Sequence, residues 1–143
     1  MSASVLVHWP NATEEEQQGH PGFFNDAHAW ASWIVAVLGD ESARRRLARL
    51  GLDALLSYTT QGADAEAVAW TTPDALESAA RGLRRFVERG DPVVAALVEL
   101  YEANAPGVDE AAVELARDLG DVGEIADYAR RCGASKVTLG YYW

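Results

Sequence analysis

The stretch of residues 25–39 constrains the fold of this chain more than any other, because it carries two tryptophans at helical spacing. Its large apolar residues recur on one face of a helix, and they are Trp30, Trp33, Ile34, Val37 and Leu38. Asn25 or Asp26 can cap the start of this helix, and Gly39 can end it in a left-handed conformation. Two indoles on one helix bury more area than a typical helical face. We therefore predict that this segment is the central core helix.

Cap and stop residues predict further helices along the chain. Thr72-Pro73 is the clearest signal, because a Thr cap followed by Pro at the first helical position marks a helix start. The predicted spans are 41–50, 73–89, 92–103, a helix from Asp109 to Gly120 and a last helix from Asp121 to Gly133. Residues 10–22 are expected to form an acidic loop, in which Thr13 and Glu16 match a capping box for one turn over 14–18.

Alternating apolar residues predict strands at both ends of the chain and in its middle. Residues 4–9 and 136–143 alternate in this way, and the second segment ends in three aromatic residues. Residues 52–60 are ambiguous between helix and strand, and 67–71 reads as the returning strand of a hairpin with them. The predicted fold class is therefore α+β, with a small mixed sheet of about four strands packed with five or six helices.

The length of 143 residues fits a single globular domain spanning 1–143. No apolar run is long enough to span a membrane, and residues 5–7 are too short for the core of a signal peptide. The lone cysteine, Cys132, excludes an internal disulfide, which fits a reducing compartment. Arginine and alanine are frequent, which suggests a GC-rich coding bias. We expect a cytoplasmic, bacterial protein.

The net charge of −10 is the strongest bound on function. It argues against binding to nucleic acid or to anionic membranes, because both would be repelled. Residues 1–39 hold four acidic residues and no Lys or Arg, and residues 91–143 hold ten acidic residues against four basic ones. The middle of the chain is balanced. A partner with a basic surface is therefore expected.

No catalytic or metal-binding motif is recognisable in the chain. The three histidines, His8, His20 and His28, are separated by 12 and 8 residues, and the cysteine is far from them in sequence. A zinc site needs closer or more regular spacing. No metal ion and no cofactor are expected, and we expect a binding protein rather than an enzyme. A small-molecule site or an enzyme cleft near the N-terminal His and Trp residues is the alternative.

The arginines of the 41–50 helix, at positions 44, 45, 46 and 49, invite a phosphate-binding interpretation. The net negative charge and the absence of an adjoining Gly-rich loop argue against it. Acidic partners on neighbouring helices are the expected explanation for these arginines. Cys132 is expected to be a small buried residue near a helix end, although its neighbours Arg130 and Arg131 could lower the pKa of its thiol.

Small size, acidity and abundant carboxylates favour an inhibitor that binds a basic protein partner. In size and charge the chain resembles bacterial immunity proteins and antitoxins, although no residues can be matched to a motif of such a family. Carboxylates would steer association, and aromatic side chains would anchor the complex. The predicted partner-binding residues are Trp9, Glu14, Glu15, Glu16, His20, Phe23, Phe24, Glu110, Glu114, Asp118, Tyr141, Tyr142 and Trp143. The oligomeric state is left open.

Overall fold

A computed structural model of the chain describes residues 4–19, 21, 28–60, 69–105 and 110–142. Its α-helices are α1 Glu14–Gln18, α2 His28–Leu38, α3 Glu41–Arg49, α4 Pro73–Glu88, α5 Ala95–Asn104 and α6 Ala111–Arg131. Two 3-10 helices are η1 Asp53–Leu56 and η3 Pro92–Val94, and the strands are β1 Ser4–His8, β2 Tyr58–Thr60 and β3 Thr138–Tyr142. Most of the described residues are therefore helical.

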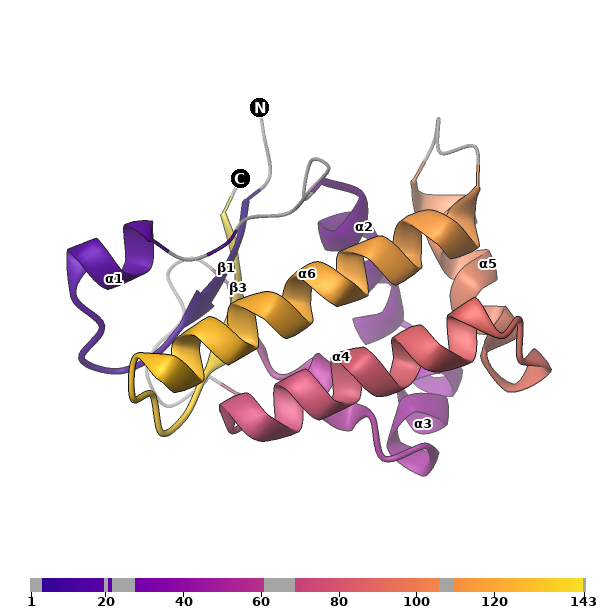
Figure 1. Cartoon of the computed structure of the whole chain (residues 1–143). Helices are drawn as coiled ribbons and strands as arrows, with labels where there is room; N and C mark the ends of the chain where they lie inside the picture. Colours follow the sequence, from indigo (N-terminus) through magenta and orange to yellow (C-terminus); the bar gives the residue numbers. More distant parts are fainter. Residues whose placement is uncertain (1–3, 20, 22–27, 61–68, 106–109, 143) are drawn as a thin grey trace.

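The helices α4 and α6 lie side by side and form the most extensive contact in the molecule (Figure 1). They run antiparallel, because Asp74 at the start of α4 pairs with Arg130 at the end of α6 at 3.0 Å. Their apolar faces are continuous, with Leu76, Leu83 and Leu119 fully buried. The apolar stripe of α4 is therefore the side of this helix that meets α6.

Helix α2 is confirmed as a core helix. Trp30, Trp33, Ile34 and Val37 are all completely buried. The two indole rings lie 5.0 Å apart, and the indole N–H of Trp33 donates a hydrogen bond of 2.9 Å to the carbonyl oxygen of Leu97 in α5. Because a buried indole N–H needs an acceptor, this bond fixes α2 against α5 as well as satisfying the ring.

The three strands pair in the order β1-β3-β2 at one side of the helices. β3 is antiparallel to β1, with Ser4 opposite Tyr142, and parallel to β2, with Tyr58 opposite Leu139. The two ends of the chain therefore lie next to each other in this small sheet (Figure 1). The strands predicted near both ends of the sequence occupy this position.

The predicted α+β fold with a sheet of about four strands is wrong. The described part of the chain is mostly helical, and its strands are only three to five residues long. The middle hairpin is not formed: Asp53–Leu56 is a 3-10 helix, β2 pairs with β3, and Thr71 bridges Val137. The intervening residues 61–68 lie outside the described residues. The leucines at 52, 55 and 56 follow the helical period, which explains the 3-10 helix. The C-terminal segment pairs both with β2 and with Thr71, in place of the predicted pairing of the two hairpin strands with each other.

The predicted pair of helices on either side of Gly120 is a single helix, α6. Gly120 is buried in its middle, and a Cβ at this position would lie 2.5 Å from Nη1 of Arg84 in α4. Glycine is therefore present to let the Arg84 guanidinium lie against α6, and not to stop a helix. Although α6 is the longest helix, none of the described helices is long and apolar enough to cross a membrane.

Several other local helix signals are confirmed, but Gly39 is not left-handed, because the described glycines with positive φ are Gly51, Gly90 and Gly133. The predicted caps Asn25 and Asp26 lie outside the described residues. The side chains of Asp40 and Thr72 accept hydrogen bonds from backbone N–H groups at the starts of α3 and α4. Thr13 and Glu16 form the complete capping box at α1. These caps depend only on residues three positions away, so the sequence alone specifies them.

Candidate functional site

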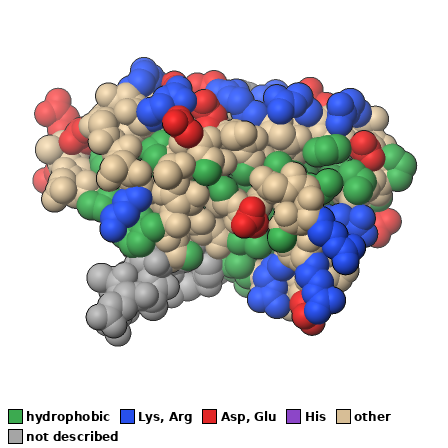
Figure 2. All heavy atoms as spheres, turned by 90° about the horizontal axis from the view of Figure 1, so that it is seen from below, with side chains coloured by type: hydrophobic (Ala, Val, Ile, Leu, Met, Phe, Trp, Pro, Cys, Tyr) green, Lys and Arg blue, Asp and Glu red, His purple; other side chains and the backbone are tan. Residues whose placement is uncertain are grey.

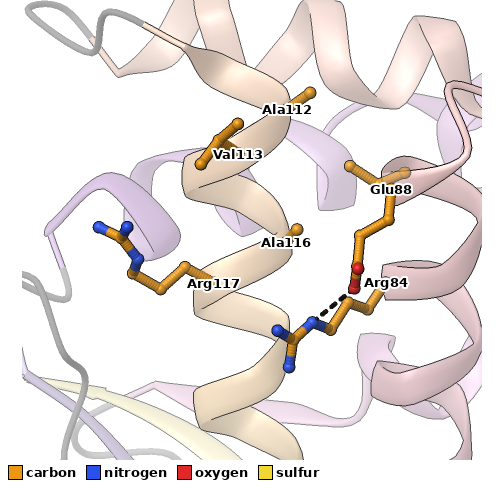
Figure 3. Close-up of a pocket in the computed structure, with 7 residues that line it drawn as sticks. Arg84, Glu88, Ala112, Val113, Ala116 and Arg117 are labelled. Atoms are coloured by element: carbon orange, nitrogen blue, oxygen red, sulfur yellow. Dashed lines mark hydrogen bonds and ion pairs between the residues drawn. The ribbon is translucent and has the colours of Figure 1, made fainter.

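A groove of about 430 Å³ lies between the end of α4 and the start of α6 (Figure 3). Val87, Ala112, Val113 and Ala116 form its apolar lining, and Arg84, Glu88 and Arg117 complete it. Ala112 and Ala116 are four residues apart on one face of α6. Their side chains are too short to fill the space between α6 and α4. The hollow therefore follows from the small residues of α6.

Val113 gives the groove an exposed apolar side chain. It is 48% exposed and, within the described residues, shares this property among large hydrophobic side chains only with Val35 of α2. Ala116 and Leu119 occupy the buried face, and Val113 projects beside it.

Ion pairs hold the charged side chains around this groove. Nε of Arg84 donates a 2.7 Å hydrogen bond to Oε1 of Glu88, and Figure 3 shows this pair along the α4 side. Arg117 contacts Glu114 at 3.4 Å on α6. Glu110, the first residue before α6, is exposed and lies one turn before Val113. The start of α6 thus combines an exposed apolar side chain with carboxylates.

A buried polar pair joins α5 to α6 at another point. The hydroxyl of Tyr101 donates a 2.6 Å hydrogen bond to Oδ2 of Asp118, and both side chains are 1% exposed. The other carboxylate oxygen, Oδ1, has no hydrogen-bond partner among the described residues. The pKa of Asp118 is raised from 3.8 to about 7, mainly by burial; the hydrogen bond from Tyr101 lowers it, and the neighbouring carboxylates of Asp121 and Glu114 contribute to the rise.

The predicted partner contacts on α6, which are Glu110, Glu114 and Asp118, therefore do not form one exposed surface. Asp118 is a core residue and cannot contact a partner on the surface, so its assignment as a partner-binding residue is wrong. Glu114 is partly buried, and only Glu110 of the predicted three is fully exposed. The spacing of three or four residues placed them on neighbouring parts of the helix, but α5 covers the later part.

Trp9 is also a core residue rather than a surface anchor. It is 5% exposed, and its ring meets that of Tyr128 edge-on, with the ring centroids 6.3 Å apart. Trp9, Trp30 and Trp33 are all buried, and the alternative of a small-molecule site or enzyme cleft near the N-terminal His and Trp residues stays a prediction. His28 is exposed at the start of α2.

The three glutamates of α1 lie at one end of the molecule (Figure 1). Glu14 and Glu15 are exposed, as predicted for partner contacts. The side chain of Glu16 instead accepts a hydrogen bond from the backbone N–H of Thr13 at 3.1 Å, and this bond lowers its pKa. Tyr141 and Tyr142 belong to β3. The predicted residues His20, Phe23, Phe24 and Trp143 lie outside the described residues.

Within the described part of the chain, no group of three or more His, Cys, Asp or Glu residues is placed to hold a metal ion. The groove between α4 and α6 was missed by the sequence analysis. Its only sequence signal is that Val113 falls one turn after an exposed acidic residue, Glu110, at a helix start. No known protein family, curated protein or solved structure matches this chain.

Proposed function

We propose that this chain is a small cytoplasmic protein-binding domain that inhibits a basic protein partner, in the manner of an immunity protein or antitoxin. The observation that supports it is the groove at the start of α6, where Val113 is exposed one turn after the exposed Glu110. Protein interfaces commonly combine an apolar centre with a polar rim. The groove offers this combination on a surface made by two firmly packed helices.

Each part of this surface has a separate role in the proposed complex. An apolar side chain of the partner enters the groove between Val87 and Val113. Basic side chains of the partner contact Glu110 and Glu114 around it. Apolar burial then supports affinity, and the carboxylates accelerate the encounter and select a basic surface.

The net charge of −10 supports steering of a basic partner over longer distances. Exposed charges are screened over about 8–10 Å at physiological ionic strength, so the association rate should fall as salt is added. The exposed Glu14 and Glu15 of α1 add to this field from the opposite end of the molecule (Figure 1). The surface around Glu14 and Glu15 is therefore the alternative location for the interface.

The partner is identified first, by affinity capture from the native host followed by mass spectrometry. Association with the purified partner is then compared for Val113→Ser and for Val35→Ser, the matched control with the same 48% exposure on α2. We expect weaker binding only for the first. Glu110→Lys should slow association by about tenfold, while the double change Glu14→Lys and Glu15→Lys should have a smaller effect.

Three results would contradict the proposal in different ways. A larger effect of the α1 double change would move the interface to α1. Equal effects of the two valine changes would exclude the groove. Association that is indifferent to salt and to all the charge reversals would exclude a basic partner.

A further inference from the structure

The helices α3 and α4 carry a basic face although the molecule as a whole is acidic. We define this basic face by Arg44, Arg46 and Arg49 of α3 together with Arg85 of α4 and Arg89, the residue after α4. Figure 2 views the molecule from below, the side on which α3 and α4 lie in Figure 1, and shows Lys and Arg side chains in groups separated mostly by uncharged ones. Charge is therefore unevenly distributed over the surface.

The local sequence explains why these arginines point outward. In α3 the buried positions are Ala43 and Leu47, so the remaining positions of this short helix face solvent. In α4, Gly82 faces Leu52, just before η1, and Arg85 and Arg89 follow it at intervals of three and four residues. Residues at this spacing share one side of a helix. The exposed arginines of α4 therefore lie on the side of α4 that faces the connection after α3.

The arginines of the basic face have no acidic partner within the described residues. The neighbouring Arg45 of α3 is not part of this face, because its Nη2 lies 2.6 Å from Oε1 of Glu41 in its own helix. No ion pair joins Arg44, Arg46, Arg49, Arg85 or Arg89 to a described carboxylate, and Arg89 instead lies over the ring of Phe86 at 5.0 Å. The expected acidic partners on neighbouring helices are thus not found for these arginines.

The arginines elsewhere in the described chain are paired. Arg81 and Arg84 of α4 contact Glu124 and Glu88, and Arg117, Arg130 and Arg131 of α6 contact carboxylates of their own helix. With 22 acidic residues for 12 basic ones, a lack of carboxylates cannot explain the unpaired set. Within the described residues, the unpaired arginines all belong to α3 and to the end of α4.

We propose that the basic face binds a short acidic segment of a protein partner, separately from the groove at α6. Guanidinium groups bind carboxylates through two parallel hydrogen bonds, so unpaired arginines are suited to Asp and Glu side chains. Contact distances are shorter than the screening length, so the local positive charge decides binding there despite the net charge of the molecule.

The borders of the basic face favour a short ligand. A hollow of about 370 Å³ between α3 and α5 is lined by both Arg46 and Glu99. The acidic side chain of Glu99 therefore borders the basic face on the side of α5. Glu14 and Glu15 lie beyond it at the far end of the molecule (Figure 1). A nucleic acid duplex carries charge about every 1.7 Å along its whole length and would extend over these carboxylates. An acidic segment of a few residues can stay within the face.

Single exposed ion pairs contribute little, about 0–1 kcal/mol each, so the test must detect weak binding. The full-length protein, labelled with nitrogen-15, is titrated with a hexaglutamate peptide blocked at both ends, and amide and arginine Nε–H shifts are followed by NMR. We expect saturable shifts confined to α3 and the end of α4. The double variant Arg44→Gln and Arg49→Gln should weaken binding at least fivefold.

Matched controls separate this face from general charge effects. Arg45→Gln removes an adjacent arginine that is already paired with Glu41, and Arg131→Gln removes one paired with Asp127. Both should bind the peptide within about twofold of the unmodified chain. A lysine hexapeptide should shift the acidic ends of the molecule instead.

Several outcomes would overturn the proposal. Shifts spread over the whole surface, or equal losses in the Arg45 and Arg131 variants, would show unspecific attraction. Tighter binding of a short DNA duplex to the same residues would assign the face to nucleic acid. Concentration-dependent shifts of these residues without peptide would assign it to a second copy of the chain. No shift at millimolar peptide would show that the face does not bind acidic segments.

Discussion

The hydroxyl of Tyr101 donates a 2.6 Å hydrogen bond to Oδ2 of Asp118, and this pair joins α5 to α6 inside the core. One oxygen of the carboxylate is satisfied and the other is buried without a described partner. A charged carboxylate in such a place is costly, so the proton is retained to higher pH than in water. Asp118 is therefore a titratable group whose hydrogen bond with Tyr101 connects α5 and α6.

Asp118→Asn should remove a pH-dependent component of stability. The pKa of Asp118 is about 7 in the fold and near 3.8 when the chain is unfolded, so its stabilising contribution is full below about pH 4 and is lost as pH rises to 7. The stability of the unmodified chain, relative to Asp118→Asn, should therefore fall between about pH 5 and pH 8. Urea unfolding at both pH values measures this difference.

The exposed aspartate at position 53 supplies the control. Asp53→Asn is measured over the same pH range, so that the effect of replacing an exposed aspartate by asparagine is known. Equal pH dependence in the unmodified chain and in Asp118→Asn would show that Asp118 is charged in the folded protein at all these pH values.

Trp33→Ala should destabilise the fold by about 3–5 kcal/mol, the range for removing a large buried aromatic side chain. Trp33 is completely buried, and the substitution also leaves the carbonyl oxygen of Leu97 without its donor. Val35→Ala, on the exposed side of the same helix, should change stability by no more than about 0.5 kcal/mol. Chemical denaturation of both variants tests this. A loss under about 1 kcal/mol at Trp33 would contradict its role in the core.

Glycine substitutions should have opposite effects at two positions. Gly123→Ala in α6 should stabilise by about 0.5–1 kcal/mol, because alanine favours a helix and the added Cβ meets Arg81 at an ordinary 3.5 Å. Gly51→Ala should destabilise by about 1–2 kcal/mol, because its φ is +72°. Gly120→Ala must displace the Arg84 guanidinium and should gain less than Gly123→Ala. Thermal unfolding of the three variants ranks their stabilities. A loss of stability in Gly123→Ala would show that the added Cβ is not accommodated beside Arg81.

Deleting residues 137–143 should abolish the cooperative thermal transition. The segment contains β3, which lies between β1 and β2, and the buried residues Val137 and Leu139. Without it both outer strands lose their hydrogen-bond partner. Near-ultraviolet circular dichroism and a thermal scan would detect a molten chain. A sharp transition within a few degrees of the complete chain would show that this strand is dispensable.

Short-range features of the fold were predictable from the sequence. The caps at Asp40 and Thr72 and the capping box of Thr13 and Glu16 need only neighbours three residues away. The apolar period of α2 likewise identified the buried face with Trp30 and Trp33. These features recur in the fold because the groups that form them are local in sequence.

Features that depend on distant neighbours were predicted wrongly. Gly120 has the same sequence signature as a helix stop, and only the approach of Arg84 from α4 shows why α6 continues through it. The middle hairpin failed for a similar reason, because β2 finds its partner in the C-terminal strand. Pairing between segments far apart in sequence leaves no local trace.

The same distinction separates the candidate surface residues. The sequence by itself determined the charge of the molecule, most helix boundaries and the apolar stripe of each helix, since these follow from composition and spacing. Only the tertiary structure decided that Asp118 is buried, that Val113 is exposed and that Arg44, Arg46 and Arg49 of α3 form no ion pair with a described carboxylate. Spacing places a side chain on a side of its helix, but the helices that pack around it decide whether that side meets protein or solvent.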